Sequence, residues 1–233
     1  LDSAATLSLA VSALGSEKVT GLIMPFHVTE SVDLADNHAK SLGVKTVTIN
    51  INDIVSSYKK SSHLYSEKLS EGNLHSRIRM SLLYGYGFSS NRLVVGTSNK
   101  SELLIGYYTK WGDGGTDFLP IGDLYKSQIF KLGESLEIPS EILTRKPTAE
   151  LWPEQTDEAD LGFSYLELDK VLYELERFSG VDQISDKTGI SIKKIAKIQG
   201  LIRSSIHKRA FPPVCKIGLR TVGLDWRETI GTK

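Results

Sequence analysis

Residues 19–51, VTGLIMPFHVTESVDLADNHAKSLGVKTVTINI, contain two short apolar runs on either side of a helical segment. The first run, Val19 to Met24, is typical of a buried strand, and the second, Val44 to Ile51, is β-branched and alternates as strands do. Between the runs, Thr29 is suited to cap a helix that continues to about Leu42. This strand–helix–strand order predicts two parallel strands with a helix packed on them.

The remaining chain extends the same pattern on both sides. We predict a helix over residues 2–14 and, over residues 56–72, a helix end followed by a mobile connection. The further predicted elements are helices over 74–88, 123–136, 166–178 and 191–208, a third strand over 92–95, and loop-rich segments over 97–117 and 137–162. The sequence therefore predicts one α/β domain over residues 1–233, a doubly wound, Rossmann-like parallel sheet with C-terminal helices.

Composition narrows the classes of function. Lys and Arg together number 28, as do Asp and Glu, which argues against a long basic surface for nucleic acid or a polybasic membrane patch. A single cysteine, Cys215, cannot form an internal disulfide, so we expect a cytoplasmic protein. Nothing near Cys215 suggests a base or an oxyanion site, so we interpret it as structural.

Two polar segments lie where predicted helices begin. Asp2 and Ser3 open the first helix, where Asp2 is either a plain N-cap or a ligand for a Mg²⁺ ion that bridges it to phosphates. Residues 96–102, GTSNKSE, follow the third predicted strand, at the sheet edge where ligands bind. Thr97 and Glu102 offer oxygen ligands there, although a simple strand-to-helix turn capped by Ser98 or Asn99 fits equally well.

The segment 107–117, YYTKWGDGGTD, is poor material for a hydrophobic core. Its glycines permit a close approach of the backbone to a ligand, and its aromatic rings can stack on a planar group, although Asp-Gly-Gly also occurs in hairpin turns. Arg77 and Arg79 lie two apart on a predicted helix and face different directions, so one of them can reach a phosphate. The cations of residues 207–209, HKR, suit the end of a helix even without a ligand.

Taken together, these segments resemble the NAD synthetase family over nearly the whole chain. Residues 73–80, NLHSRIRM, are similar to the family's Asn-x-x-x-Arg-x-Arg-Met helix. The other matching segments occur in the family's order: 96–102 (GTSNKSE), 106–115 (GYYTKWGDGG), 146–152 (KPTAELW), 155–158 (QTDE) and 207–209 (HKR). The resemblance implies an adenine nucleotide alpha hydrolase-like fold and an enzyme that adenylates deamido-NAD with ATP. Ammonia then displaces AMP, which completes NAD.

The resemblance also implies roles for individual residues. Asp2 and Glu102 would hold Mg²⁺. The residues expected to contact ATP are Asp2, Ser3, Thr97, Lys126 and Thr148. Those expected to bind deamido-NAD are Arg77, Lys110, Asp117, His207 and Lys208. Asp113 or Asp117 would help to deprotonate ammonium, and the sequence does not distinguish between them.

The resemblance carries three expectations about organisation. Leu1 to Ser3 resemble the end of the family's Ser-Gly-Gly-x-Asp-Ser loop, so we expect the Ser-Gly-Gly portion and its strand ahead of residue 1. Family members form homodimers, and we expect the same here, with free ammonia as the nitrogen source and with no nucleic-acid or membrane partner. Two alternatives remain at this point: an amidating synthetase for a different acid, and a nucleotide-binding module without turnover.

Overall fold

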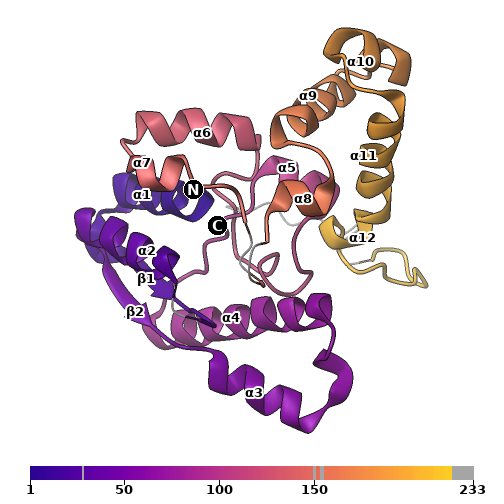
Figure 1. Ribbon diagram of the computed structural model, residues 1–233. Helices are drawn as coiled ribbons and strands as arrows, with labels where there is room; N and C mark the ends of the chain where they lie inside the picture. Colours follow the sequence, from indigo (N-terminus) through magenta and orange to yellow (C-terminus); the bar gives the residue numbers. More distant parts are fainter. Residues whose placement is uncertain (28, 149–150, 153–154, 222–233) are drawn as a thin grey trace.

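The computed structural model describes residues 1–27, 29–148, 151–152 and 155–221 as a mixed α/β fold that is mostly helical. In chain order, its main elements are α1 (Asp2–Leu14), β1 (Thr20–Ile23), α2 (Glu30–Ser41), β2 (Lys45–Thr48), α3 (Asn52–Ser61), α4 (Lys68–Ser90), α5 (Lys100–Ile105), α6 (Lys126–Ser135), α7 (Ser140–Leu143), α8 (Asp157–Leu161), α9 (Tyr165–Glu176), α10 (Val181–Thr188), α11 (Ile192–Ser204) and α12 (Ile206–Arg209). In Figure 1, α3 and α4 run along the bottom, and α9, α10 and α11 stand together at one side.

The predicted strand–helix–strand unit is confirmed. β1 and β2 form a two-stranded parallel sheet, in which Thr20 pairs with Lys45 and Ile23 with Thr48. The crossover helix α2 begins after Thr29, as predicted, and packs on both strands. Parallel pairing follows because the helix returns the chain to the same end of the sheet.

The predicted third strand, residues 92–95, is wrong as a member of this sheet. Val95 instead makes an isolated parallel bridge with Phe118. The backbone N–H of Gly96 donates to the carbonyl of Phe118 at 2.9 Å, and that of Asp117 donates to the carbonyl of Val94 at 2.9 Å. The segment therefore pairs with the chain that returns from the glycine-rich loop, and a cleft separates it from β1.

The polar segment 56–72 contains more helix than predicted. It contains the end of α3 and the start of α4, and the connection between them includes a short turn at His63–Tyr65. Lys59 on α3 pairs with Glu71 on α4 at 2.9 Å. Buried Ile51 and Val55 pack against Leu74 and Ile78 of α4, and this packing outweighs the weak helical pattern of the sequence.

The C-terminal helices form their own hydrophobic cluster. Leu168 and Val171 of α9 pack with Ile184 of α10 and with Ile195 and Ile198 of α11, all fully buried. α8 and α10 were not predicted, since short helices carry little periodic signal. The predicted helix 191–208 is two helices, because the chain turns at Ser205, which packs on Gly106 at the end of α5.

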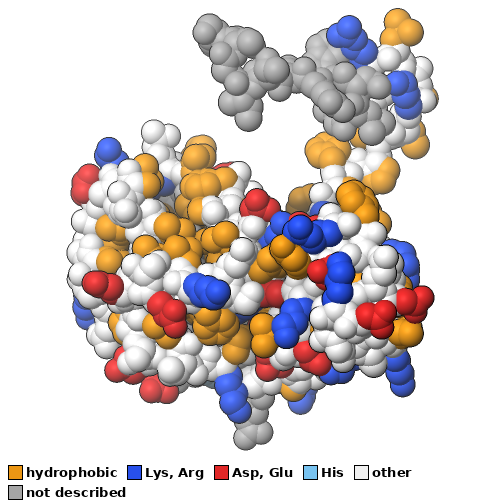
Figure 2. All heavy atoms as spheres, turned by 90° about the horizontal axis from the view of Figure 1, so that it is seen from above, with side chains coloured by type: hydrophobic (Ala, Val, Ile, Leu, Met, Phe, Trp, Pro, Cys, Tyr) orange, Lys and Arg blue, Asp and Glu red, His pale blue; other side chains and the backbone are white. Residues whose placement is uncertain are grey.

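Two features of the structure concern the nucleic-acid and membrane surfaces that the composition argues against. Lys and Arg side chains are interspersed with Asp and Glu on the face drawn in Figure 2. Within the described ranges, we find no helix with the length and apolar character that a membrane crossing requires. Cys215 is exposed, so it is not a packing residue of the core.

Candidate functional site

Three polar side chains from distant parts of the sequence meet at one buried point. Asp2 begins α1, Glu102 lies in the first turn of α5, and Lys126 begins α6. The Lys126 ammonium donates to Asp2 Oδ2 and lies 3.4 Å from Glu102 Oε1, with only 3% of the lysine exposed. The fold thus brings together three of the six residues that the sequence predicted to bind metal or ATP.

Helix capping explains how the two carboxylates are held. Asn99 is the N-cap of α5, as one of the two sequence alternatives had it, and its side chain accepts from the backbone N–H of Glu102 at 3.0 Å. The amide Nδ2 of Asn99 donates to Asp2 Oδ1 at 2.9 Å. Asn99 is fully buried, so a single side chain both caps α5 and fixes the acid of α1.

Burial and mutual charge shift the pKa values of this cluster. Burial, together with the charge of Asp2, raises the pKa of Glu102 to about 7. Burial also opposes ionisation of Asp2, but the charge and hydrogen bond of Lys126 hold its pKa below the usual value. The pKa of Lys126 is raised, because attraction to Asp2 and Glu102 outweighs burial. Two buried acids that share one cation form an electrostatic setting that favours a further positive charge.

A second group of predicted residues lies where the glycine-rich loop meets α12. Arg77 Nη2 donates to the backbone carbonyl of Lys110 at 3.5 Å, and Lys110 Nζ donates to the carbonyl of His207 at 2.7 Å. Lys208 Nζ donates to the carbonyls of Gly106 and Tyr108 at 2.7 and 2.6 Å. Four of the five residues assigned to deamido-NAD are therefore linked in one place.

The glycine-rich loop is a tight turn and not a hairpin between strands. The backbone N–H groups of Gly112 and Gly114 both donate to the carbonyl of Thr109. A Cβ on Gly112 would lie 2.8 Å from the Cβ of Ser76 on α4, so glycine permits the loop to pack against that helix. Asp113 Oδ1 accepts from the backbone N–H of Thr109 at 2.9 Å and closes the turn.

The two candidate acids of this loop are placed differently. Asp113 is exposed and lines the cavity described below. Asp117 accepts from the backbone N–H of Val94 at 2.7 Å and from the hydroxyl of Tyr84 at 3.1 Å. The carboxylate of Asp117 therefore joins the third extended segment to α4.

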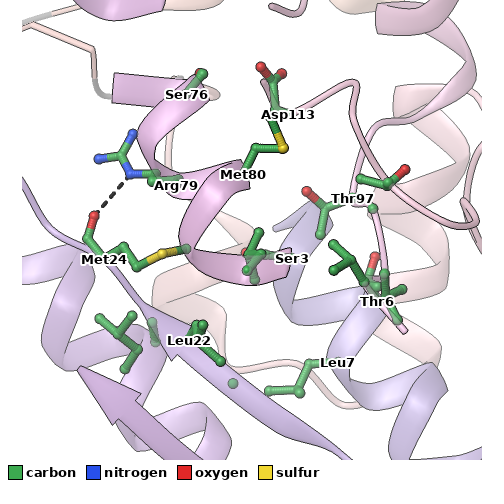
Figure 3. Close-up of a pocket in the computed structure, with 18 of the residues that line it drawn as sticks. Ser3, Thr6, Leu7, Leu22, Met24, Ser76, Arg79, Met80, Thr97 and Asp113 are labelled. Atoms are coloured by element: carbon green, nitrogen blue, oxygen red, sulfur yellow. Dashed lines mark hydrogen bonds between the residues drawn. The ribbon is translucent and has the colours of Figure 1, made fainter. Parts of the chain in front are cut away.

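A cavity of about 2450 Å³ lies between β1, α1, α4 and the segment 91–97. Figure 3 shows Ser3 and Thr6 of α1, Thr97, and Arg79 and Met80 of α4 around this space. Thr148 and Lys208 also contribute to the lining. Asp2, Glu102 and Lys126 are not lining residues, although Leu1 and Ser3, the chain neighbours of Asp2, are. Of the two arginines of α4, Arg79 lines the cavity and anchors its Nε to the carbonyl of Met24 at 2.9 Å.

Sequence reasoning missed two residues beside the buried cluster. The hydroxyl of Tyr165, at the start of α9, lies 3.3 Å from Glu102 Oε1 and 3.0 Å from Asp157 Oδ2. Asp157 lies within the segment 155–158 that resembles the family, but no role was assigned to it. A signal for Tyr165 was absent, because a tyrosine at a helix start is ordinary core material.

Comparisons with known proteins identify the relatives of this chain. The profile of the family described as "NAD synthase" matches residues 1–212. The NH(3)-dependent NAD(+) synthetase of Archaeoglobus fulgidus is 47% identical over 220 residues, which cover 93% of this chain and 85% of that protein. The synthetase of the same name from Methanosarcina acetivorans is 47% identical and covers 92% and 86%.

Solved structures agree with this relationship. The NMN synthetase of Francisella tularensis is 34% identical, with a TM-score of 0.80 over 92% of this chain and 84% of that one. The NH3-dependent NAD synthetase of Campylobacter jejuni, in complex with the nitrate ion, is 33% identical, with a TM-score of 0.76 and coverage of 92% and 85%. With the family profile over most of its length and relatives at this level of identity, the chain belongs to the NAD synthase family.

Proposed function

We infer that this chain catalyses the ATP-dependent amidation of deamido-NAD by ammonia, which yields NAD, AMP and pyrophosphate. The observation that carries this inference is the convergence of Asp2, Glu102 and Lys126 in a member of the NAD synthase family. Attack of a carboxylate on the α-phosphate of ATP places charge on the departing pyrophosphate, and a fixed cation beside the phosphates stabilises that charge. A module that only binds nucleotide has no need of this arrangement.

The donor set fits Mg²⁺. Among the described residues, no group of three or more His, Cys, Asp or Glu side chains forms a metal site. Magnesium does not require one, because it commonly keeps several waters and takes one or two carboxylates together with substrate phosphates. Asp2 and Glu102 would hold the ion, and when bound it would supply Lewis-acid stabilisation of the phosphate oxygens.

The roles proposed for this chain's other residues follow the two groups of side chains. Ser3, Thr97 and Thr148 line the cavity, which supports their assignment to ATP together with Lys126. The links among Arg77, Lys110, His207 and Lys208 support a common site for deamido-NAD, to which Asp117 is also assigned.

Asp113 is the better candidate to accept a proton from ammonium. Asp113 is one of the residues that line the cavity, and one of its carboxylate oxygens accepts from the backbone N–H of Thr109. The carboxylate of Asp117 already accepts two hydrogen bonds from Val94 and Tyr84. A general base must lie within hydrogen-bond reach of the proton that it accepts, and Asp113 lines the cavity whereas Asp117 does not, which favours Asp113.

A second candidate function is amidation of nicotinate mononucleotide. The likeness to the NMN synthetase of Francisella tularensis, with a TM-score of 0.80, is the observation that favours it. Both reactions amidate the same pyridine carboxylate, and the substrates differ by an adenylyl group. The higher identity, 47%, to NH(3)-dependent NAD(+) synthetases favours the dinucleotide.

The test is an assay of purified enzyme with ATP, Mg²⁺ and ammonium, in which deamido-NAD or nicotinate mononucleotide is the acid. We expect NAD, AMP and pyrophosphate in equal amounts from deamido-NAD, and a much lower kcat/KM for the mononucleotide. Release of ADP and phosphate would contradict the adenylation chemistry. A higher kcat/KM for the mononucleotide would select the second candidate.

We further propose a wider, doubly wound sheet within a single domain over residues 1–233. The cleft between β1 and Val94–Gly96 supports this, because it has the apolar lining of Leu22, Leu7 and Val95 that a further strand would cover. α1 and α2 lie together, and the cluster of α3 and α4 packs around Met24 and Phe26.

Two further expectations of the sequence analysis stay proposals. Exposed Phe88 and Leu93, at the end of α4 and just beyond it, support a homodimer, which sedimentation of the purified protein would test. The single cysteine, Cys215, supports a cytoplasmic location.

A further inference from the structure

A buried tyrosine hydroxyl lies between two carboxylates beside the proposed magnesium site. Tyr165 is 3% exposed, and its hydroxyl lies 3.3 Å from Glu102 Oε1 and 3.0 Å from Asp157 Oδ2. A phenol has one proton to donate, so the hydroxyl is shared between the two acids. Buried polar groups are normally hydrogen-bonded, and this hydroxyl has two carboxylate acceptors.

Contacts of both the backbone and the ring fix the position of Tyr165. Its backbone N–H donates to Glu158 Oε1 at 2.9 Å, and Ser164 and Glu167 cap the helix that it begins. The ammonium of Lys126 lies 5.1 Å from the centre of its ring, within the range of a cation–π contact. The ring therefore has little freedom, and its hydroxyl is a rigid donor.

Glu102 has two further contacts of similar length. Its Oε1 lies 3.4 Å from Lys126 Nζ, and its Oε2 accepts from the backbone N–H of Asn99 at 3.3 Å. The ammonium of Lys126 is divided between Asp2 and Glu102, whereas the phenol of Tyr165 approaches Glu102 from a different helix, α9. Tyr165 is thus well placed to help the backbone N–H of Asn99 set the direction of the Glu102 carboxylate.

Asp157 joins the tyrosine to a neighbouring segment of the protein. Its backbone N–H donates to the carbonyl of Pro147 at 3.1 Å, next to Thr148, and its Oδ1 accepts from the hydroxyl of Tyr107 at 3.3 Å. The hydroxyls of Tyr107 and Tyr165 thus approach different oxygens of this carboxylate, and that of Tyr107 also donates to Asp160 Oδ2 at 2.9 Å. Asp157 can influence Glu102 through Tyr165.

We propose that Tyr165 is a positioning residue that orients Glu102 toward the magnesium ion, and that Asp157 acts through Tyr165. This inference rests on the proposed function, because it takes Glu102 as a metal ligand. Outer partners of metal-binding carboxylates fix their orientation, and their loss commonly weakens metal binding by about 10- to 100-fold. Loss of the hydroxyl alone, with the ring kept, lies at the lower end of that range.

The test is Tyr165→Phe in the complete protein, which keeps the ring over Lys126 and removes only the hydroxyl. Binding of Mg²⁺ is measured by calorimetry, and binding of Mn²⁺ by electron paramagnetic resonance. Both are measured with α,β-methylene ATP present and deamido-NAD absent. We expect metal binding to weaken by about tenfold. The Mg²⁺ concentration for half-maximal NAD formation should rise by the same factor, with kcat recovered at saturating Mg²⁺.

Tyr125→Phe is the matched control. Tyr125 is 6% exposed, belongs to the same hydrophobic cluster, and donates its hydroxyl to Glu176 Oε2 at 2.6 Å, a carboxylate outside the site. We expect unchanged metal binding in this variant. Unchanged binding in Tyr165→Phe, or equal weakening in both variants, would overturn the proposal.

A double variant tests the part assigned to Asp157. If Asp157 acts through the tyrosine, Tyr165→Phe with Asp157→Asn should bind metal as weakly as Tyr165→Phe alone. An additive loss would refute that route. Because metal binding is measured without turnover, wild-type protein that binds Mn²⁺ normally but makes no NAD would refute the proposed function and leave the tyrosine's role to be judged separately.

Discussion

A buried lysine and a half-buried one are held in contrasting ways. Lys126, at the start of α6, meets the carboxylates of Asp2 and Glu102, and their attraction raises its pKa despite burial. Lys208, in α12, donates to the backbone carbonyls of Gly106 and Tyr108. Burial lowers the pKa of Lys208, with a small opposing effect from Asp113.

The partners of the two lysines predict different behaviour. The carboxylates around Lys126 can bind another cation in its place, whereas the backbone carbonyls around Lys208, here called the Lys208 corner, hold the lysine as part of the packing. Carboxylates carry a full charge that a metal ion can take over, whereas carbonyls at the end of a helix offer only partial charge. Arg209 strengthens the second arrangement, because its Nη1 donates to the carbonyl of Leu103 at 2.9 Å. We therefore expect the Lys126 cluster to respond to Mg²⁺ and the Lys208 corner to respond to changes in packing.

Replacing each lysine by methionine is expected to give the largest effect. Lys126→Met leaves two buried acids without their cation and should lower the free energy of unfolding by about 3–5 kcal/mol. Lys208→Met removes a charged donor from two carbonyls and should cost about 1.5–3 kcal/mol. Urea unfolding with and without millimolar Mg²⁺ measures both, and Mg²⁺ should restore stability to Lys126→Met only. If Mg²⁺ changed the stability of both variants equally, the proposed difference between the surroundings of Lys126 and Lys208 would be wrong.

Glu102→Gln tests, by its effect on catalysis, whether the carboxylates around Lys126 bind a metal ion. The amide keeps the shape of the side chain but loses its charge, so we expect kcat to fall by about 100-fold, as for loss of one group that stabilises developing charge. The Kd for deamido-NAD should change far less. Steady-state kinetics and direct binding of the dinucleotide give the two values, and equal losses in both would show that Glu102 is not a metal ligand.

Lys110→Ala tests the corner near Lys208. Lys110 Nζ reaches the carbonyl of His207 at 2.7 Å, so its charge lies close to the proposed dinucleotide site. We expect the KM for deamido-NAD to rise by about tenfold, the equivalent of one charged hydrogen bond, with kcat nearly unchanged. An unchanged KM would refute the assignment, and Lys187→Ala, on α10, is a suitable surface control.

His75 extends the comparison to a buried group whose nearest carboxylate, Glu71 Oε1, lies 3.9 Å from its Nε2, beyond hydrogen-bond distance. It is 1% exposed, its ring lies 4.3 Å from that of Phe26, and neither ring nitrogen has a hydrogen-bond partner within the described segments. Burial, with the charge of Arg79, lowers the pKa of His75 to about 4. Because the unfolded chain takes up a proton near pH 6.5, the stability from neutral His75 is complete above that pH and is lost as the pH falls toward 4.

His75→Leu should remove this dependence on pH. Between pH 7 and pH 5, the wild type is expected to lose about 1–2 kcal/mol relative to the variant. Urea unfolding at the two pH values measures the difference, and His63→Leu, at an exposed histidine, controls for the loss of an imidazole. Identical pH slopes for wild type and His75→Leu would show that His75 does not titrate in this way.

The predictable parts of the fold share one physical property. α1, α2, β1 and β2 have strong local signals, such as the Thr29 cap and the β-branched alternation of residues 44–51, and each formed close to its predicted bounds. The prediction for residues 92–95 was wrong because the pairing of a strand depends on which segment lies beside it in space. The sequence of these residues does not show whether that segment is β1 or the one that contains Phe118. The break of the last helix at Ser205 likewise depends on Gly106, about a hundred positions away.

The sequence by itself determined the family, the strand–helix–strand unit and the set of polar residues, because these are carried by motifs and by local periodicity. Only the tertiary structure decided that Asp2, Glu102 and Lys126 meet at one buried point and that the hydroxyl of Tyr165 reaches Glu102. It also decided that Asp113 lines the cavity while the carboxylate of Asp117 joins Val94 to Tyr84. The physical reason is that charge interactions act over a few ångströms of space, whatever the separation of the residues along the chain.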